Sequence, residues 1–248
     1  GIAALVIACL APSVPYSSGR VARARWIPAL LGYTMLGLAA LAKGPVGLIL
    51  PLIVVHVWWL ICHRWQHAAT TTLEADLGDS RNDTTRTDSW GRWLWQQCCA
   101  AWNTFNPLQC FRALLALRTI PGVLVSLLAA APWYIAVGIE TNGDFLRGFF
   151  LEHNVGRALG SMEGHNGSIL FYPVAFLVGI FPWSMWIIPA VLWCVKASRD
   201  NLVQRQMIVL SAVWIGVYVL AFSAASTKLP SYITPCYAGA ALTLGGFW

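Results

Sequence analysis

Charged residues are scarce in this sequence. Of 248 residues, 10% are charged and 58% are hydrophobic, and the mean hydropathy is +0.62. A soluble globular domain carries about 25% charged residues. The hydrophobic residues also lack the two-residue and 3.6-residue periods of half-buried strands and helices, and instead form long uninterrupted blocks. The composition therefore excludes an ordinary soluble domain and predicts an all-α, polytopic membrane bundle.

The sequence also lacks the cysteine and histidine spacings of known metal sites. Cys98 and Cys99 are adjacent and do not form a C-x-x-C motif, so a zinc site is not expected there. His63 and His67 are four residues apart and could share a helix face, but no third ligand accompanies them. We favour a basic helix end at the membrane interface for this pair.

Neither end of the sequence has a recognisable targeting segment or polar tail. The opening run GIAALVIACLAP is apolar, but it is shorter than the roughly 20 residues that a spanning helix needs. It has no basic region and no small-residue cleavage site, so it is a poor signal peptide. We expect the sequence to be a fragment of a larger membrane protein.

Six apolar stretches are long enough to predict about six full membrane spans. They cover residues 26–42, 45–61, 119–138, 169–195, 207–223 and 231–246. The fourth stretch contains Pro173, Pro182 and Pro189. Proline removes a backbone donor from a helix, so this stretch predicts a kinked or broken helix.

Basic residues orient these spans. Segments 20–25, 62–118 and 196–205 hold 12 of the 16 Lys and Arg residues, and alternation of six spans places all three segments on one side. The positive-inside rule predicts that this side is cytoplasmic. Residues 1–61 then form a partial span and two helices. Residues 62–118 form a cytoplasmic loop with a polar, disordered insertion at 66–93, and residues 119–248 form a second membrane segment with an outward loop at 139–168.

The other four basic residues, Lys43, Arg147, Arg157 and Lys228, fall on the outward side. Three motifs, LAKGPVG, EHNVGR and STKLPSY, each place a cation beside Gly or Pro at a span end or in a connecting loop. Arg157 offers a planar donor fork suited to phosphate, lysine offers a point charge, and Tyr232 adds a hydroxyl donor. These residues predict an anion site at the membrane surface, with a lipid headgroup as the anion.

Each of these residues also has a structural alternative. Lys43 could simply extend to the interface, Arg157 could form a weak surface ion pair, and Lys228 could be a topological stop. Glu152 and His153 could bind a divalent cation, but adjacent residues need a third ligand from elsewhere. The residues alone therefore predict only a polytopic membrane protein with an outward basic pocket.

Five segments resemble, in the same order, a known group of bacterial enzymes. They are LAALAKGPVGLILPL, APWYIAV, FFLEHNVGRAL, FYPVAFLVGIFPWSMWIIPA and FSAASTKLPSYITPCY. The sequence is similar to the aminoarabinose lipid A transferases and their relatives, which resemble protein O-mannosyltransferases and share the GT-C membrane fold. The resemblance covers most of the chain except residues 66 to about 93, and STKLPSYITPCY is its most specific piece.

The resemblance implies a glycosyltransferase that takes a sugar from a polyprenyl-phosphate carrier. It would transfer the sugar to a lipid, glycan or protein acceptor on the periplasmic side of the inner membrane, with membrane lipids and no nucleic acid as partners. The resemblance further implies that Arg157 contacts the carrier phosphate, with Tyr232 beside it and Lys228 close. It makes His153 a candidate ligand for zinc or magnesium. The general base of the family is an aspartate upstream of this sequence, so this part alone is expected to be inactive.

A transporter of lipid or polyprenyl phosphate with an outward anion pocket is the main alternative, and a non-catalytic membrane scaffold is a weaker one. Transporters typically show internal repeats and helices broken at mid-membrane that carry polar residues. The sequence has no evident repeat, and its polar groups cluster at span ends. These features favour the enzyme.

Overall fold

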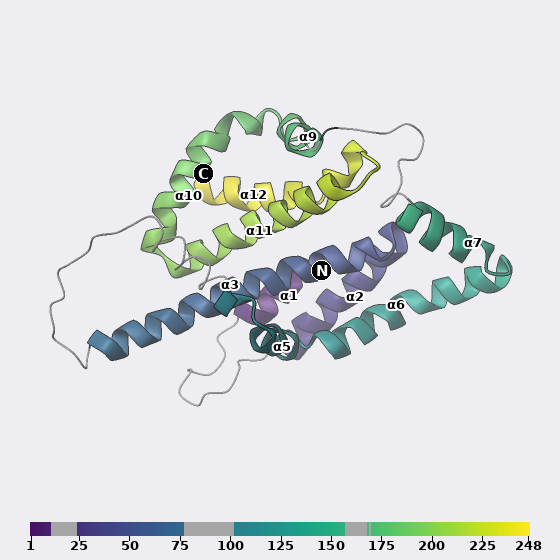
Figure 1. The fold of residues 1–248 in the computed structure, drawn as a ribbon, viewed down its shortest axis with the longest axis horizontal. Helices are drawn as coiled ribbons and strands as arrows, with labels where there is room; N and C mark the ends of the chain where they lie inside the picture. Colours follow the sequence, from purple (N-terminus) through teal and green to yellow (C-terminus); the bar gives the residue numbers. More distant parts are fainter. Residues whose placement is uncertain (11–23, 77–101, 157–167, 169) are drawn as a thin grey trace.

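The computed structural model describes residues 1–10, 24–76, 102–156, 168 and 170–248, and its regular structure within these ranges is helical (Figure 1). The elements are α1 (Ile2–Leu10), α2 (Trp26–Lys43), α3 (Val46–Asp76), α5 (Pro107–Ala116), α6 (Thr119–Glu140), α7 (Asp144–Arg147), the π-helix η1 (Gly148–Gly156), α9 (Phe171–Gly179), η2 (Trp183–Trp186), α10 (Ile187–Asp200), α11 (Leu202–Ala224), η3 (Pro230–Ile233) and α12 (Cys236–Phe247).

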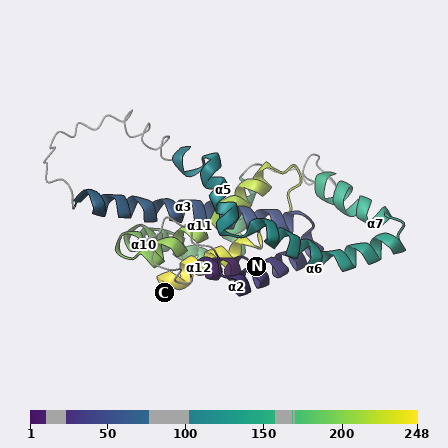
Figure 2. The ribbon, with the colours of Figure 1, turned by 90° about the horizontal axis from the view of Figure 1, so that it is seen from below.

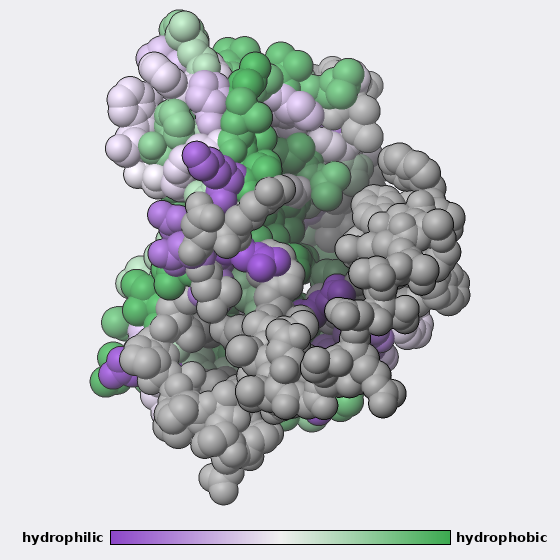
Figure 3. Space-filling view, turned by 90° about the vertical axis from the view of Figure 1, so that its left-hand side faces the viewer, coloured by the Kyte–Doolittle hydropathy of each residue, from purple (hydrophilic) through white to green (hydrophobic). Residues whose placement is uncertain are grey.

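The long helices run between two ends of the molecule (Figures 1 and 2). One end carries the α2–α3 turn, η1 and η3, and we call it the outer end after the predicted orientation. The other, inner end carries the C-terminal part of α3, α5 and the α10–α11 corner. Figure 3 faces this inner end, where hydrophilic residues lie among hydrophobic ones. The three outward motifs therefore lie at one end of the fold.

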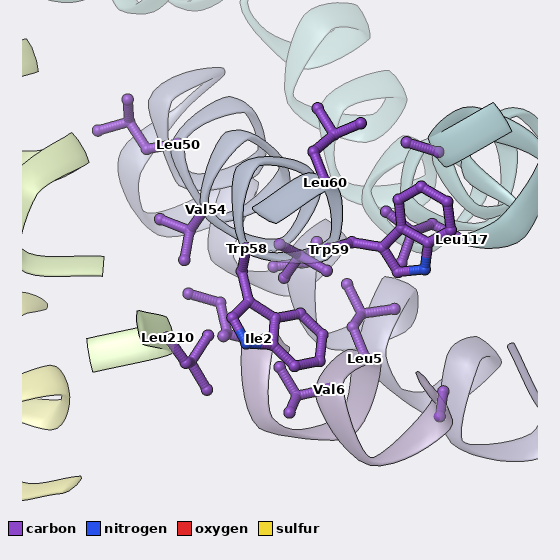
Figure 4. Close-up of a cluster of buried hydrophobic side chains, with 14 of the residues drawn as sticks. Ile2, Leu5, Val6, Leu50, Val54, Trp58, Trp59, Leu60, Leu117 and Leu210 are labelled. Carbon is purple, nitrogen blue, oxygen red and sulfur yellow. The ribbon is translucent and has the colours of Figure 1, made fainter. Parts of the chain in front are cut away.

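The core lies where α1 and α11 pack against α3 (Figure 4). Val54 and Trp58 of α3 are buried there, together with Leu5 of α1 and Leu210 of α11. The indole Nε1 of Trp58 donates a hydrogen bond of 2.9 Å to the Gln206 carbonyl oxygen. This bond satisfies a buried donor and fixes α11 against α3.

Small residues allow α2 and α6 to pack closely. A Cβ on Gly37 would lie 2.3 Å from the Ser126 carbonyl oxygen, and one on Gly122 would overlap the ring of Tyr33. The Ser126 hydroxyl donates to the Tyr33 carbonyl oxygen at 2.7 Å. Close backbone approach and hydrogen bonds between helices are the usual means of association inside a membrane, where burial from water gives no driving force.

The all-α membrane fold is confirmed, and up to five of the six predicted spans coincide with apolar helices, or a bent helix pair, of spanning length. In the described residues, α2, the Val46–Arg64 part of α3, α6 and α11 are long and apolar enough to cross a membrane, and the bent pair α9 and α10 raises the number to five at most. The sixth predicted span, residues 231–246, begins in η3 and becomes α-helical only in α12. Pro230 and Pro235 delay its start, because proline interrupts helical hydrogen bonding.

The predicted break in the fourth span is confirmed. Helix α9 ends at Gly179, the Phe181–Pro182 peptide bond is cis, and the helix resumes near Trp183 with a bend of 106°. The segment between the two helices is apolar.

The predicted loop at residues 62–118 holds more helix than expected, because α3 continues to Asp76 and α5 lies within the segment. Residues 77–93 of the predicted insertion lie outside the described residues.

Candidate functional site

The α2–α3 turn holds Lys43 at the outer end. Gly44 ends α2 at φ 65° and ψ −154°, a conformation open essentially to glycine, and its N–H donates to the Ala40 carbonyl oxygen at 2.8 Å. Pro45 follows and directly precedes α3. A Cβ on Gly47 would lie 2.5 Å from the Ala39 carbonyl oxygen, so the turn is also tight on its far side. The KGPVG sequence thus fixes where the exposed ammonium of Lys43 emerges.

The EHNVGR motif begins inside the π-helix η1. The side-chain Nδ2 of Asn154 donates to the Phe149 carbonyl oxygen at 2.7 Å, five residues earlier. A Cβ on Gly44 would lie 2.7–3.0 Å from the Asn154 carboxamide, so the two segments are in direct contact. π-Helical turns are rare and are frequent at functional sites. The described part of EHNVGR therefore packs on the Lys-Gly-Pro turn.

Tyr134 fastens the same region to α6. Its hydroxyl donates to the Ala40 carbonyl oxygen at 2.7 Å. Its ring lies 5.3 Å from that of Phe150 and 6.1 Å from that of Phe149, measured between centroids. Tyr134 was not among the site residues predicted from the sequence. The position of Tyr134 near the end of a predicted span, in the APWYIAV segment, is the sequence feature that indicates a polar partner for its hydroxyl.

Lys228 is buried, with 7% of its surface exposed. Its Nζ donates to the carbonyl oxygens of Phe222 at 3.1 Å and Ala225 at 2.7 Å, and also to that of Ser223. A cation at a helix C-terminus is favourable because carbonyls without helical partners gather there. In this arrangement the ammonium caps α11 and supplies positive charge, while its donors face protein carbonyls.

Tyr172 of α9 supports the same segment. Its hydroxyl accepts a hydrogen bond from the Leu229 N–H at 3.1 Å, and its ring centroid lies 5.6 Å from the Lys228 Nζ. Tyr172 is fully buried. The FYPVAF segment, part of the fourth predicted span, therefore holds the KLPSY segment in place.

Lys43 and Tyr232 bring two distant motifs together. The Nζ of Lys43 lies 5.6 Å from the centroid of the Tyr232 ring, within cation–π range. The Tyr232 ring in turn packs on the Phe222 ring at 5.0 Å between centroids. Within the described part of the chain, no carboxylate pairs with Lys43. The ammonium therefore keeps donors for an anion at this end.

Arg157 and the side chain of His153 lie outside the described residues. Arg157 follows Gly156, the last residue of η1, so the chain leaves the described contact with Gly44 only three residues after Asn154. The described residues contain no group of three His, Cys, Asp or Glu side chains that could hold a metal ion. The roles of Arg157 and His153 stay predictions.

Comparison with known proteins agrees with the resemblance read from the sequence. No family model matches the sequence. The chain is 30% identical over 125 residues to the undecaprenyl phosphate-alpha-4-amino-4-deoxy-L-arabinose arabinosyl transferase of Pectobacterium carotovorum and 27% identical to that of Yersinia pestis. Each match covers 50% of this chain and only 22% of the relative.

Solved structures extend the similarity to nearly the whole chain. The crystal structure of ArnT from Cupriavidus metallidurans bound to undecaprenyl phosphate matches 99% of this chain, with a TM-score of 0.60 and 22% identity. The apo form of the same protein matches with a TM-score of 0.56 and 21% identity. This chain spans 34% of that neighbour's length. The chain therefore has the membrane fold of the corresponding part of ArnT.

Proposed function

We propose that the protein is a membrane glycosyltransferase that takes a sugar from a polyprenyl-phosphate carrier. The names of the relatives support undecaprenyl phosphate as the carrier and 4-amino-4-deoxy-L-arabinose as the sugar. The acceptor would be a lipid such as lipid A, or a related glycan or protein, on the periplasmic side of the inner membrane.

One observation carries this proposal. Three turns that are far apart in the sequence meet at the outer end, where Gly44 touches Asn154 and the ammonium of Lys43 faces the ring of Tyr232. The meeting point joins two cations, Lys43 and Lys228, through Tyr232 and Phe222. Arg157 follows directly on the chain. A cluster of this kind at a membrane surface suits the phosphate of a lipid carrier.

The proposed chemistry uses these cations to stabilise a leaving group. When the bond between the sugar carbon and the phosphate oxygen breaks, its electron pair stays on the oxygen and negative charge grows there. Lys43 and Arg157 would donate to this charge, Tyr232 would add a hydrogen bond, and Lys228 would contribute positive potential from its fixed position. Preorganised donors of this kind stabilise the transition state more than the ground state. A general base from the remainder of the protein would take the proton of the acceptor.

The transporter alternative has less support. The bend between α9 and α10 is the one break within a span among the described residues. Its residues are Ile180, Phe181 and Pro182, which carry no ionisable group. A transport site formed by a broken helix would be expected to present polar side chains at such a break.

Replacing Arg157 tests the proposal. In membranes that contain the intact protein, Arg157→Ala should lower transfer from the polyprenyl-phosphate sugar by about 100-fold or more, as expected for loss of one preorganised donor. Arg147→Ala is the matched control, because this arginine of α7 lies in the same loop, is exposed and precedes η1. Equal protein levels and near-parental activity of Arg147→Ala are expected. Near-parental activity of Arg157→Ala would overturn the assignment.

A divalent cation held in part by His153 is a second, separable proposal. Treatment of the intact protein with a chelator should lower transfer, and return of zinc or magnesium should restore it. His153→Ala should make transfer insensitive to both steps. If chelation has no effect on the parental protein, the metal proposal fails and the phosphate site is unaffected.

A further inference from the structure

Helix α5 lies across the inner end of the molecule. Its N-cap is Asn106, whose Oδ1 accepts from the Gln109 N–H at 2.8 Å. After Ala116 the chain turns at Leu117 and Arg118 into α6, and Arg118 has a left-handed φ of 54°. Figure 2 shows α5 at a steep angle to α6. The helix therefore does not extend the span but runs across its end.

Two spans set the depth of α5 relative to the membrane. Helix α6 begins its apolar span at Thr119, directly after the turn, and the apolar part of α3 ends at Arg64. The Nη1 of Arg64 donates to the Thr104 hydroxyl at 3.1 Å, two residues before the N-cap of α5. Both ends of α5 are thus tied to the level at which a predicted span meets water.

One face of α5 is covered by protein and the other is not. Ala113 and Ala116 are buried, and the helix contacts α3 and α6. On the opposite side Leu108, Phe111 and Leu115 follow the spacing of a single helix face. These residues and Phe105 are 41–56% exposed. An apolar helix face at the membrane interface is suited to contact with acyl chains.

Arginines lie beside this apolar face. Arg112 comes four residues after Leu108 and three before Leu115, so it lies next to both on the helix surface. The guanidinium of Arg118 lies 3.9 Å from the Trp26 ring centroid, and its Nε donates to the Ala24 carbonyl oxygen at 2.7 Å. These contacts fix the position of Arg118. Only Nε of the Arg118 guanidinium donates a hydrogen bond in these contacts, so both of its Nη atoms can donate to an anion.

Arg112 and Arg118 have no carboxylate partner among the side chains that the structure describes. The carboxylates whose side chains the structure describes, Glu140, Asp144 and Glu152, all lie near the outer end. Described cations at the inner end are Arg25, Arg64, Arg112, Arg118, Lys196 and Arg205. Figure 3 shows hydrophilic residues beside hydrophobic ones at this end. The exposed apolar face of α5, together with Arg112 and Arg118, is therefore complementary to a molecule with acyl chains and a negative headgroup.

We propose that α5 and the following turn form a binding site for an anionic phospholipid of the leaflet at the inner end. Arg112 and Arg118 hold the phosphate. Arg112 lies in the second half of α5 and Arg118 in the turn that follows the helix, and each guanidinium offers a planar donor fork suited to phosphate. The acyl chains lie along Phe105, Leu108, Phe111 and Leu115. This site is separate from the proposed transferase site at the outer end and does not depend on it.

Lipid binding to the intact purified protein tests the proposal. Titration with phosphatidylglycerol and with phosphatidylcholine, followed by native mass spectrometry, should show preferential binding of the anionic lipid. Arg112→Gln should weaken phosphatidylglycerol binding about fivefold, the effect expected for one arginine near an anionic surface. Arg112 has no hydrogen-bond partner among the described residues, so folding should be preserved. Phe111→Ser should weaken binding of both lipids.

Lys196→Gln is the matched control. Lys196 is exposed on α10 at the same end, and its replacement removes one positive charge away from α5. It should change phosphatidylglycerol binding by less than twofold. Equal effects of Lys196→Gln and Arg112→Gln would overturn the site in favour of a diffuse basic surface. Unchanged lipid binding in Phe111→Ser would also overturn it, because the apolar face would then be covered by protein.

Discussion

At the outer end the ammonium of Lys228 is enclosed by three carbonyl oxygens, whereas at the inner end Arg112 has no hydrogen-bond partner among the described residues. The outer end has few cations, and the described ones lie within or beside tight turns. The inner end has many, on exposed helix surfaces and corners. Charge at the inner end follows the general preference for basic cytoplasmic segments. Charge at the outer end is placed individually by backbone conformation.

The number of charged residues at an end of the molecule and the contacts of each charged residue therefore carry separate information. The positive-inside rule counts residues and takes no account of their contacts. The outer cations are informative because Gly44, Pro45 and Pro230 shape the turns that carry them. The same two ends therefore differ in how they should respond to substitution.

The largest expected effect on stability is at Lys228. Lys228→Met should lower the free energy of unfolding by about 3 kcal/mol, because three carbonyl oxygens at the end of α11 lose a charged donor. Arg112→Met removes the same charge from the inner end and should change stability by less than about 0.5 kcal/mol. Thermal unfolding of both variants in detergent compares them. Similar unfolding temperatures for the two would remove the distinction between the ends.

A smaller effect is expected at the turn that carries Lys43. Gly44→Ala should cost about 2–3 kcal/mol, since the added Cβ meets the Asn154 carboxamide and the backbone conformation is strained for alanine. Gly143→Ala separates these causes. Gly143 has a φ of 87° but has nothing within 4 Å of its Cβ position, so only strain of about 1 kcal/mol is expected. If both substitutions cost the same, the contact with Asn154 contributes nothing.

The smallest effect concerns the hydroxyl of Tyr134. Tyr134→Phe should lower stability by about 1 kcal/mol, because it removes the hydrogen bond to Ala40 and leaves the ring packing intact. Thr34→Val removes a hydroxyl that bonds only within α2, to the Leu30 carbonyl oxygen, and should have a weaker effect. A double substitution Tyr134→Phe with Gly44→Ala measures whether the two contacts are coupled. Strict additivity would argue against a single packed outer cluster.

Much of the fold could be predicted from the sequence, because apolar length and proline position act locally. The apolar blocks predicted α2, the apolar part of α3, α6 and α11. The three prolines of the fourth block predicted a kink or break, which the structure places at Pro182. The same reasoning started the last span at residue 231, where η3 precedes α12, because hydropathy does not register the effect of proline on helical hydrogen bonding. It also treated α5 as loop, because a helix lying at the interface has no apolar stretch of spanning length.

The candidate site was only partly predictable. The motifs identified Lys43, Lys228 and Tyr232 as one group, and the structure places Lys43 against Tyr232. Three other features had no sequence signal of comparable strength. They are the hydrogen bonds from Lys228 to three carbonyl oxygens, the contact of Asn154 with Gly44 and the hydrogen bond from Tyr134 to Ala40. Each of these contacts joins a side chain to a backbone atom or to a glycine. The chemical types of the two residues therefore do not predict the contact.

The amino-acid pattern is sufficient to place the chain in a membrane, because exposing long apolar blocks to water is unfavourable and a helix forms all its backbone hydrogen bonds internally in lipid. It also determined which side the cations favour. Which cations are surrounded by protein carbonyl oxygens, and which keep N–H donors for a ligand, depends on the packing of the helices. That outcome depends on where separate helices end relative to one another, and the ends meet through packing between segments nearly 200 residues apart, as in the approach of Lys43 to Tyr232.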